Sequence, residues 1–105
     1  MSLSVLEVLR AVAVGVAYGF EILDHTRLPS GTVYPALSRL ERDGYVTSRW
    51  EDPHLAQAEK RPPRRYYDMT VRGQRALREG LRAIRERERA LRARSRILRP
   101  VRTRG

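Results

Sequence analysis

The segment SGTVYPALSRLER, residues 30–42, carries the clearest structural signal in this chain of 105 residues. Its inward-facing apolar residues recur at helical spacing: Val33, Ala36, Leu37 and Leu40. This spacing predicts a helix with one buried face. Pro29 before the segment and Gly44 after it are residue types typical of helix beginnings and ends. Pro35 lies close enough to the start that its missing N–H costs little.

The opposite face of this helix carries small and basic side chains. At about 100° per residue, it presents Gly31, Thr32, Pro35, Ser38, Arg39 and Arg42. Gly31 and Pro35 add little bulk, so the backbone can approach a partner closely, while Ser38 and Arg39 can reach base edges. An ordinary solvent face would more typically mix Glu with Lys. The pattern therefore favours a helix that enters a major groove about 12 Å wide.

Two helices are predicted before this segment. Residues 3–16 are apolar on most sides, which indicates a helix that needs more than one neighbour and is the first sign of a subunit interface. Residues 18–25 predict a short helix anchored by Phe20, Ile22 and Leu23. Because only the turn 26–29 separates it from the next helix, the two form a helix-turn-helix unit.

A β-hairpin is predicted after the helix-turn-helix. Residues 45–50 and 64–69 are rich in β-branched and aromatic residues, whereas residues 51–63 between them are too polar to pack. This is the pattern of a wing, and we expect Trp50 to lie in the core at the end of its first strand. Four basic residues of the return limb are expected to grip phosphate or the minor groove: Lys60, Arg61, Arg64 and Arg65.

A long helix is predicted over residues 71–99, with Thr70 as its N-cap and Pro100 as its terminator. Its apolar residues Leu77, Leu81, Ile84, Leu91 and Leu98 follow one heptad seam, which indicates packing in a dimer. With the apolar first helix, the expected dimer interface comprises Leu6, Leu9, Leu77, Leu81, Ile84 and Leu91. The chain is thus a mainly α-helical winged helix-turn-helix: a DNA-binding domain over 1–70, a dimerisation helix over 71–99 and a flexible basic tail over 100–105.

The net charge of +10 lies entirely in the last third of the chain. Residues 1–70 balance nine basic against nine acidic side chains, while residues 71–105 hold thirteen arginines against three glutamates. A neutral body with a cationic extension suggests a polyanionic partner, nucleic acid above all.

Four segments form a recognisable combination: YGFEI (18–22), SGTVYPALSRLE (30–41), WE (50–51) and RRYYDMT (64–70). Together they resemble the PadR family of transcriptional regulators. The resemblance implies a homodimeric winged-helix repressor on a near-palindromic operator, with the first and last helices forming the dimer contact. It also assigns Ser30, Gly31, Thr32, Tyr34, Pro35, Ser38 and Arg39 to the recognition helix. Some members bind flat aromatic effectors through their last helix, but residues 71–105 contain no Phe, Tyr or Trp, and the effector stays unnamed.

The sequence contains few features that would support another class of function. The absence of cysteine excludes disulfide scaffolds, thiolate zinc sites and cysteine nucleophiles, and no phosphate loop or catalytic constellation predicts an enzyme, a metal or a cofactor. The longest apolar run, residues 11–20, is about half a bilayer span, so we expect a cytoplasmic protein. Two alternatives stay open: RNA binding by an arginine-rich helix over 85–105, and a protein-interaction module that docks through the heptad seam.

Overall fold

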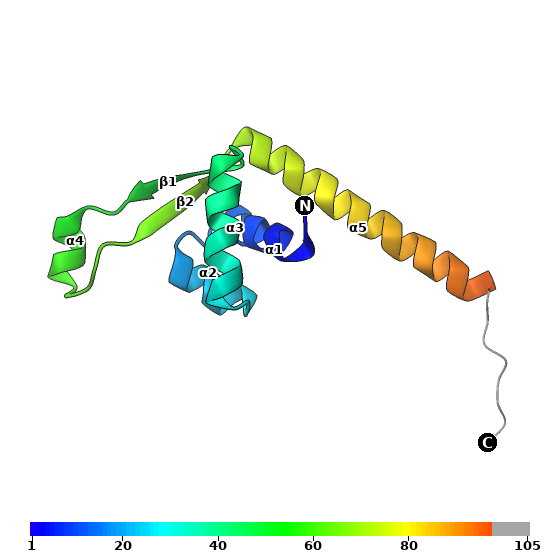
Figure 1. Ribbon diagram of the computed structural model, residues 1–105, viewed down its shortest axis with the longest axis horizontal. Coiled ribbons are helices and arrows are strands. Elements are labelled where there is room, and N and C mark those ends of the chain that lie inside the picture. Colours follow the sequence, from blue (N-terminus) through cyan, green and yellow to red (C-terminus); the bar gives the residue numbers. More distant parts are fainter. Residues whose placement is uncertain (98–105) are drawn as a thin grey trace, which may run out of the picture.

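The computed structural model describes residues 1–97, so the expected tail and Leu98 lie outside the described residues. The elements follow in the order α1 (Leu3–Ala13), α2 (Gly19–Thr26), α3 (Ser30–Arg42), β1 (Val46–Trp50), α4 (Pro53–Ala58), β2 (Arg65–Met69) and α5 (Val71–Ile97). In Figure 1 the first three helices form a body from which the hairpin extends on one side and α5 on the other. The predicted fold, a winged helix-turn-helix with a long C-terminal helix, is confirmed.

Helix α1 is the centre of the core. It packs against α2, α3, α5 and β2, and Val8 and Leu9 in its middle have no exposed surface. Fully burying such a side chain contributes about 1.5–3 kcal/mol, which is why a helix that is apolar on most sides takes this position. The apolar side chains of residues 3–16 are therefore buried mainly in the core of their own protomer.

Helix α3 has the predicted limits, and its predicted inner face is confirmed. All four inward residues are buried: Val33, Ala36, Leu37 and Leu40. Pro29 is the N-cap residue and provides no side-chain hydrogen bond. Arg27, at a left-handed φ of 61°, ends α2, and Gly44, at φ 79°, turns the chain from α3 into the hairpin. Glycine suits this turn because it has no Cβ to clash at positive φ.

The hairpin is antiparallel and leads directly into α5. Its register runs from Val46 opposite Met69 to Trp50 opposite Arg65. Thr70 follows β2 and caps α5 as predicted, because its Oγ1 accepts a hydrogen bond from the Gly73 N–H at 3.0 Å. The Thr70 hydroxyl also bonds the carbonyl of Gly44 at 2.7 Å. These bonds fix where the long helix leaves the body.

The segment 51–63 differs from the expected unpacked loop. It contains α4, which begins after Asp52, whose carboxylate accepts a hydrogen bond from the His54 N–H at 2.9 Å. Ala56 on this helix is fully buried. The short helix escaped the sequence analysis because it offers only one small buried residue, too few for a periodic pattern. In Figure 1 it forms the outer end of the wing.

Helix α5 touches the body through two glycines one heptad apart. A Cβ on Gly73 would lie 2.1 Å from the carbonyl oxygen of Tyr45, and a Cβ on Gly80 would lie 2.6 Å from Leu6 Cδ1. The first contact is with backbone, which cannot move aside as a side chain can. Gly73 therefore permits the close approach of α5 to the hairpin.

We expect Gly73→Ala to lower the free energy of unfolding by about 1–3 kcal/mol, the usual cost of overpacking. Urea denaturation followed by circular dichroism measures this change. Gly31→Ala is the matched control, because a Cβ there meets nothing within 4 Å and alanine is the better helix former. Equal stability of Gly73→Ala and the original protein would contradict the close contact.

Candidate nucleic-acid interface

The exposed face of α3 lies open to a partner along its whole length. We call Gly31, Thr32, Pro35, Ser38, Arg39 and Arg42 the recognition face. Thr32 is half-buried and the other five are exposed, as are Ser30 and Tyr34 beside them. Burial of the opposite face requires this orientation, because residues three and four apart share one side of a helix.

The two arginines of the recognition face differ in their surroundings. Arg42 lies 3.5 Å from the carboxylate of Asp43, and both side chains are well exposed, so this pair is worth little. Arg39 forms no ion pair with any residue in the described range 1–97. Its charge is therefore available to an anion or to a base edge.

Glu51 and Arg61 hold the wing together at its outer end. Two guanidinium nitrogens of Arg61 donate to the two carboxylate oxygens of Glu51 at 2.7 and 2.8 Å, and a third donates to Glu59 at 2.7 Å. Only 20% of the Arg61 side chain and 9% of the Glu51 side chain are exposed. Arg61, predicted to contact DNA, is thus neutralised within the protein and joins the two limbs of the wing.

The Glu51 carboxylate has further donors around it. The backbone N–H of Arg64 and the hydroxyl of Tyr66 each lie 3.3 Å from one of its oxygens. The hydrogen bonds from Arg61 are the main reason why the pKa of Glu51 falls from 4.5 to about 2, and Glu51 in turn raises the pKa of Arg61. The Glu51 carboxylate therefore stays ionised at any ordinary pH and keeps the two limbs of the wing joined through Arg61.

Arg65 connects the wing to α3. Its guanidinium lies 3.0 Å from a carboxylate oxygen of Glu41 in α3 and 2.8 Å from Ser48 Oγ in β1. Ser48 also donates a hydrogen bond to Glu41. This network sets the wing at a defined position beside the recognition helix.

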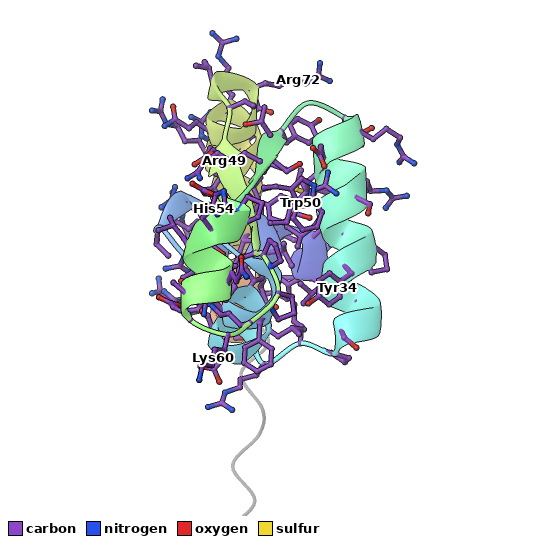
Figure 2. The ribbon with its side chains drawn as sticks, turned by 90° about the vertical axis from the view of Figure 1, so that its left-hand side faces the viewer. Tyr34, Arg49, Trp50, His54, Lys60 and Arg72 are labelled. Carbon is purple, nitrogen blue, oxygen red and sulfur yellow. The ribbon has the colours of Figure 1, made fainter. Side chains whose placement is uncertain are left out.

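The remaining wing cations lie over aromatic rings or at the surface. The Arg64 guanidinium is 4.2 Å from the centre of the Tyr18 ring, a cation–π distance. Arg49, which the sequence analysis did not select, lies 5.1 Å from the Tyr66 ring and 3.3 Å from Asp68. Lys60 is exposed at a left-handed φ of 55° and is labelled at the wing tip in Figure 2.

An open hollow of about 440 Å³ lies where α2, α3 and the wing meet. We call it the aromatic hollow; its lining includes Tyr18, Phe20, Tyr34, Trp50, Arg64, Arg65 and Tyr67. Phe20 is 74% exposed and Trp50 is 66% exposed. Exposed aromatic side chains gathered in this way indicate a contact surface. Figure 2 shows Trp50 and Tyr34 on the side where the wing faces α3.

The exposure of Phe20 and Trp50 corrects two expectations. Phe20 was expected to anchor α2, but it lies about 200° around the helix from the buried Ile22, a separation that the sequence alone could have revealed. Trp50 was expected in the core. It shares a strand face with the buried Val46, but the wing extends beyond the body at that end of β1. There the Arg65 guanidinium lies 5.6 Å from the Trp50 ring, and most of the side chain stays exposed.

The expected dimer residues divide between the core and the surface. Leu9 is fully buried in its own protomer and Leu6 packs on Gly80, so Leu9 has no surface left for a partner. Leu77, Leu81 and Ile84 are half-buried, and Leu91 is 60% exposed. Ile84 and Leu91 also line a groove of about 600 Å³ between the start of α1 and α5.

The Transcriptional regulator PadR-like family matches residues 5–79 of this sequence. That range contains all but the first two residues of α1, then α2, α3, the complete wing and the first turns of α5. The chain belongs to the PadR-like family of transcriptional regulators. A comparison with curated proteins gives no match.

Solved structures share this PadR-like fold. A PadR family transcription regulator from Clostridium difficile R20291 has a TM-score of 0.77 at 22% identity, over 88% of this chain and 97% of that chain. A protein from Streptococcus mutans UA159 has a TM-score of 0.74 at 20% identity, over 97% and 92%. A transcriptional regulator from Clostridium thermocellum has a TM-score of 0.73 at 21% identity, over 86% and 87%.

Two other classes of site are absent from residues 1–97. No cluster of three His, Cys, Asp or Glu residues in this range could hold a metal ion. Nor does any helix in the same range combine the length and apolarity that a bilayer crossing needs.

We expect Glu51→Gln to loosen the wing, because the neutral amide cannot hold the Arg61 guanidinium through two charge-assisted bonds. Amide hydrogen exchange in α4 at neutral pH should accelerate.

The pKa of Glu51 lies below its ordinary value, so the stabilisation of the wing by the Glu51 carboxylate is complete above about pH 4.5 and is lost as the pH falls towards 2. In the original protein, the fluorescence of Trp50, the only tryptophan, should therefore change as the pH falls from about 4.5 towards 2.

Glu59→Gln is the control for this experiment. Glu59 also contacts Arg61, but 64% of its side chain is exposed, so its removal should change exchange in α4 much less. Similar exchange in Glu51→Gln and the original protein would show that the ion pair does not hold the wing.

Proposed function

We propose that this PadR-like regulator is a sequence-specific DNA-binding repressor that acts as a homodimer on a near-palindromic operator. The observation that carries the proposal is the recognition face of α3, small at its start and cationic further along, with Arg39 unpaired among the described residues. A helix with this exposed face fits the major groove of duplex DNA.

The recognition face supplies base contacts in this proposal. Gly31 adds no bulk on its exposed side, where a Cβ would meet nothing within 4 Å, so the backbone of α3 can lie close to the bases. Thr32 and Ser38 offer hydroxyl groups, and Arg39 can pair with guanine through two hydrogen bonds. Ser30, Tyr34, Pro35 and Arg42, which are all exposed on α3, complete the contact.

The wing makes the backbone contacts. Lys60 is exposed at its tip, and Arg64 lies over Tyr18 at the edge of the aromatic hollow. Arg61 and Arg65 are positioning residues, since their guanidinium groups are held by Glu51 and Glu41. Phosphate contacts of this kind fix the register of a protein on DNA, while base contacts read the sequence.

A second copy of the chain covers the apolar surface in this proposal. Ile84 and the exposed Leu91 line an open groove of about 600 Å³, with the half-buried Leu81 further along the same seam, while Leu77 packs against the protomer's own core. Exposed apolar residues gathered at such a groove mark an interaction site. A two-fold dimer presents two recognition helices, and half-sites one helical turn apart place them about 34 Å from each other.

We also infer a cytoplasmic protein without catalytic activity. The family is one of transcriptional regulators, and transcription takes place where the DNA is. The proposal requires no cofactor and no metal.

Arg39→Ala should weaken binding to the operator by about 1–3 kcal/mol, the usual worth of a bidentate contact to a base. The operator is first obtained by selecting bound duplexes from a random pool, in which we expect a two-fold symmetric motif. Fluorescence anisotropy with operator and scrambled duplexes then measures the loss. An equal loss on both duplexes would assign Arg39 to phosphate, and selection without a symmetric motif would refute the proposal.

Leu91→Asp should disrupt the dimer, because it places a charge on the exposed end of the apolar seam. We expect the dissociation constant to rise at least tenfold, a loss of about 1.4 kcal/mol or more. Sedimentation velocity at micromolar concentration distinguishes monomer from dimer. Ala93→Asp, on the opposite and equally exposed side of α5, should leave the dimer intact. A monomeric original protein would contradict the dimer.

A further inference from the structure

Seven arginines form a regular line along α5. They are Arg75, Arg78, Arg82, Arg85, Arg89, Arg92 and Arg96, and we call them the arginine stripe. Their spacing alternates between three and four residues without a break. At about 100° per residue they therefore fall within an arc of about 100° on one side of the helix. The stripe spans about 32 Å at 1.5 Å per residue.

The stripe faces away from the body. Gly73 and Gly80 mark the side of α5 that contacts the hairpin and α1, and the middle of the stripe lies about 170° around the helix from Gly80. All seven side chains are exposed. The recognition face borders Ser2, Ser4 and Val5 at the start of α1, whereas α5 packs on Leu6, so the stripe and the recognition face are two separate surfaces.

The charge of the stripe is only partly offset by its neighbours, because three glutamates on α5, Glu79, Glu86 and Glu88, lie three or four residues from stripe arginines. None of the ion pairs among residues 1–97 includes an arginine of α5. Like charges three and four residues apart destabilise a helix, and the stripe repeats that arrangement over six turns. An extended anion that lies along the stripe would relieve this repulsion.

We propose that the arginine stripe is a second nucleic-acid surface, which binds the phosphate backbone of a duplex DNA segment other than the one read by α3. The proposal rests on the proposed function for its choice of duplex DNA. Guanidinium groups pair well with phosphate, and the stripe is about as long as nine base pairs of duplex at 3.4 Å each. Such contacts are independent of sequence.

The surroundings of the stripe favour DNA over a membrane. A helix that binds a lipid surface needs an apolar face to insert beside its cationic one. The apolar face of α5 is directed at Leu6 and the groove beside α1, and the residues within the stripe's arc are polar or small. The aromatic residues that stack on unpaired bases do not occur in residues 71–105, which favours duplex over single-stranded partners.

The test compares two double variants with the same loss of charge. Arg82→Gln with Arg89→Gln removes two arginines from the stripe, whereas Arg87→Gln with Arg94→Gln removes two from the other side of α5, where Arg87 lines the groove beside α1. Sedimentation velocity checks that both double variants keep the oligomeric state of the original protein. Affinity for a random-sequence duplex is measured over a range of salt concentrations. Each lost phosphate contact flattens the log–log slope by about 0.9, so the stripe variant should flatten it by about 1.8 per protomer. The other variant should change it little.

Three results would overturn the inference: equal slopes for the stripe variant and the original protein, equal flattening by both double variants, or a larger loss on an RNA hairpin or on phosphatidylglycerol vesicles than on duplex DNA. Circular dichroism confirms that both variants keep their helix.

The preference for selected over scrambled operator separates this inference from the proposed function. The stripe variant should keep that preference, and Arg39→Ala should lose it. If the stripe variant keeps the preference for the selected operator and its salt slope equals that of the original protein, the second DNA surface is refuted and the proposed function is not. If the stripe variant has a flattened salt slope but the original protein shows no preference for the selected operator over the scrambled duplex, operator recognition is refuted and the second DNA surface is not.

Discussion

The packing of α3 against α1 fixes the rotation of the recognition helix about its own axis. Val33 and Leu37 have no exposed surface, so a rotation would cost the burial of whole side chains, each about 1.5–3 kcal/mol. Because helix geometry couples the two faces, burial of one face determines which side chains the other presents. The recognition face of this PadR-like regulator is thus set by its hydrophobic core.

The cationic side chains serve different purposes that depend on their neighbours. Arg61 and Arg65 are held by carboxylates from other segments and shape the wing, whereas Arg39 has no such neighbour among the described residues. In a protein whose first 70 residues carry no net charge, internal pairing leaves few cations near α3. The contacts proposed there therefore depend on a small number of well-placed groups, while most of the excess charge lies along α5.

Helix α5 has two sides with different chemistry. Its inner side carries glycines that let it approach the body and apolar residues that line a groove. Its outer side carries the arginine stripe. Self-association through the apolar side leaves the outer side accessible, so the proposed dimer presents both its recognition helices and its stripes at once. The hydrogen bonds of Thr70 to Gly73 and Gly44 fix where α5 leaves the body.

The amino-acid sequence by itself determined every helix except α4, the hairpin, the cap at Thr70 and the inner face of α3, because these depend on local spacing and on residue type. Only the tertiary structure decided the roles of individual wing residues. Glu51 and Arg61 are ten positions apart, and Glu41 and Arg65 are twenty-four apart, so no local pattern shows that they meet. The exposure of Trp50 likewise depends on how far the wing extends beyond the body. Burial and ion pairing are properties of what surrounds a side chain, and those surroundings come from distant parts of the chain.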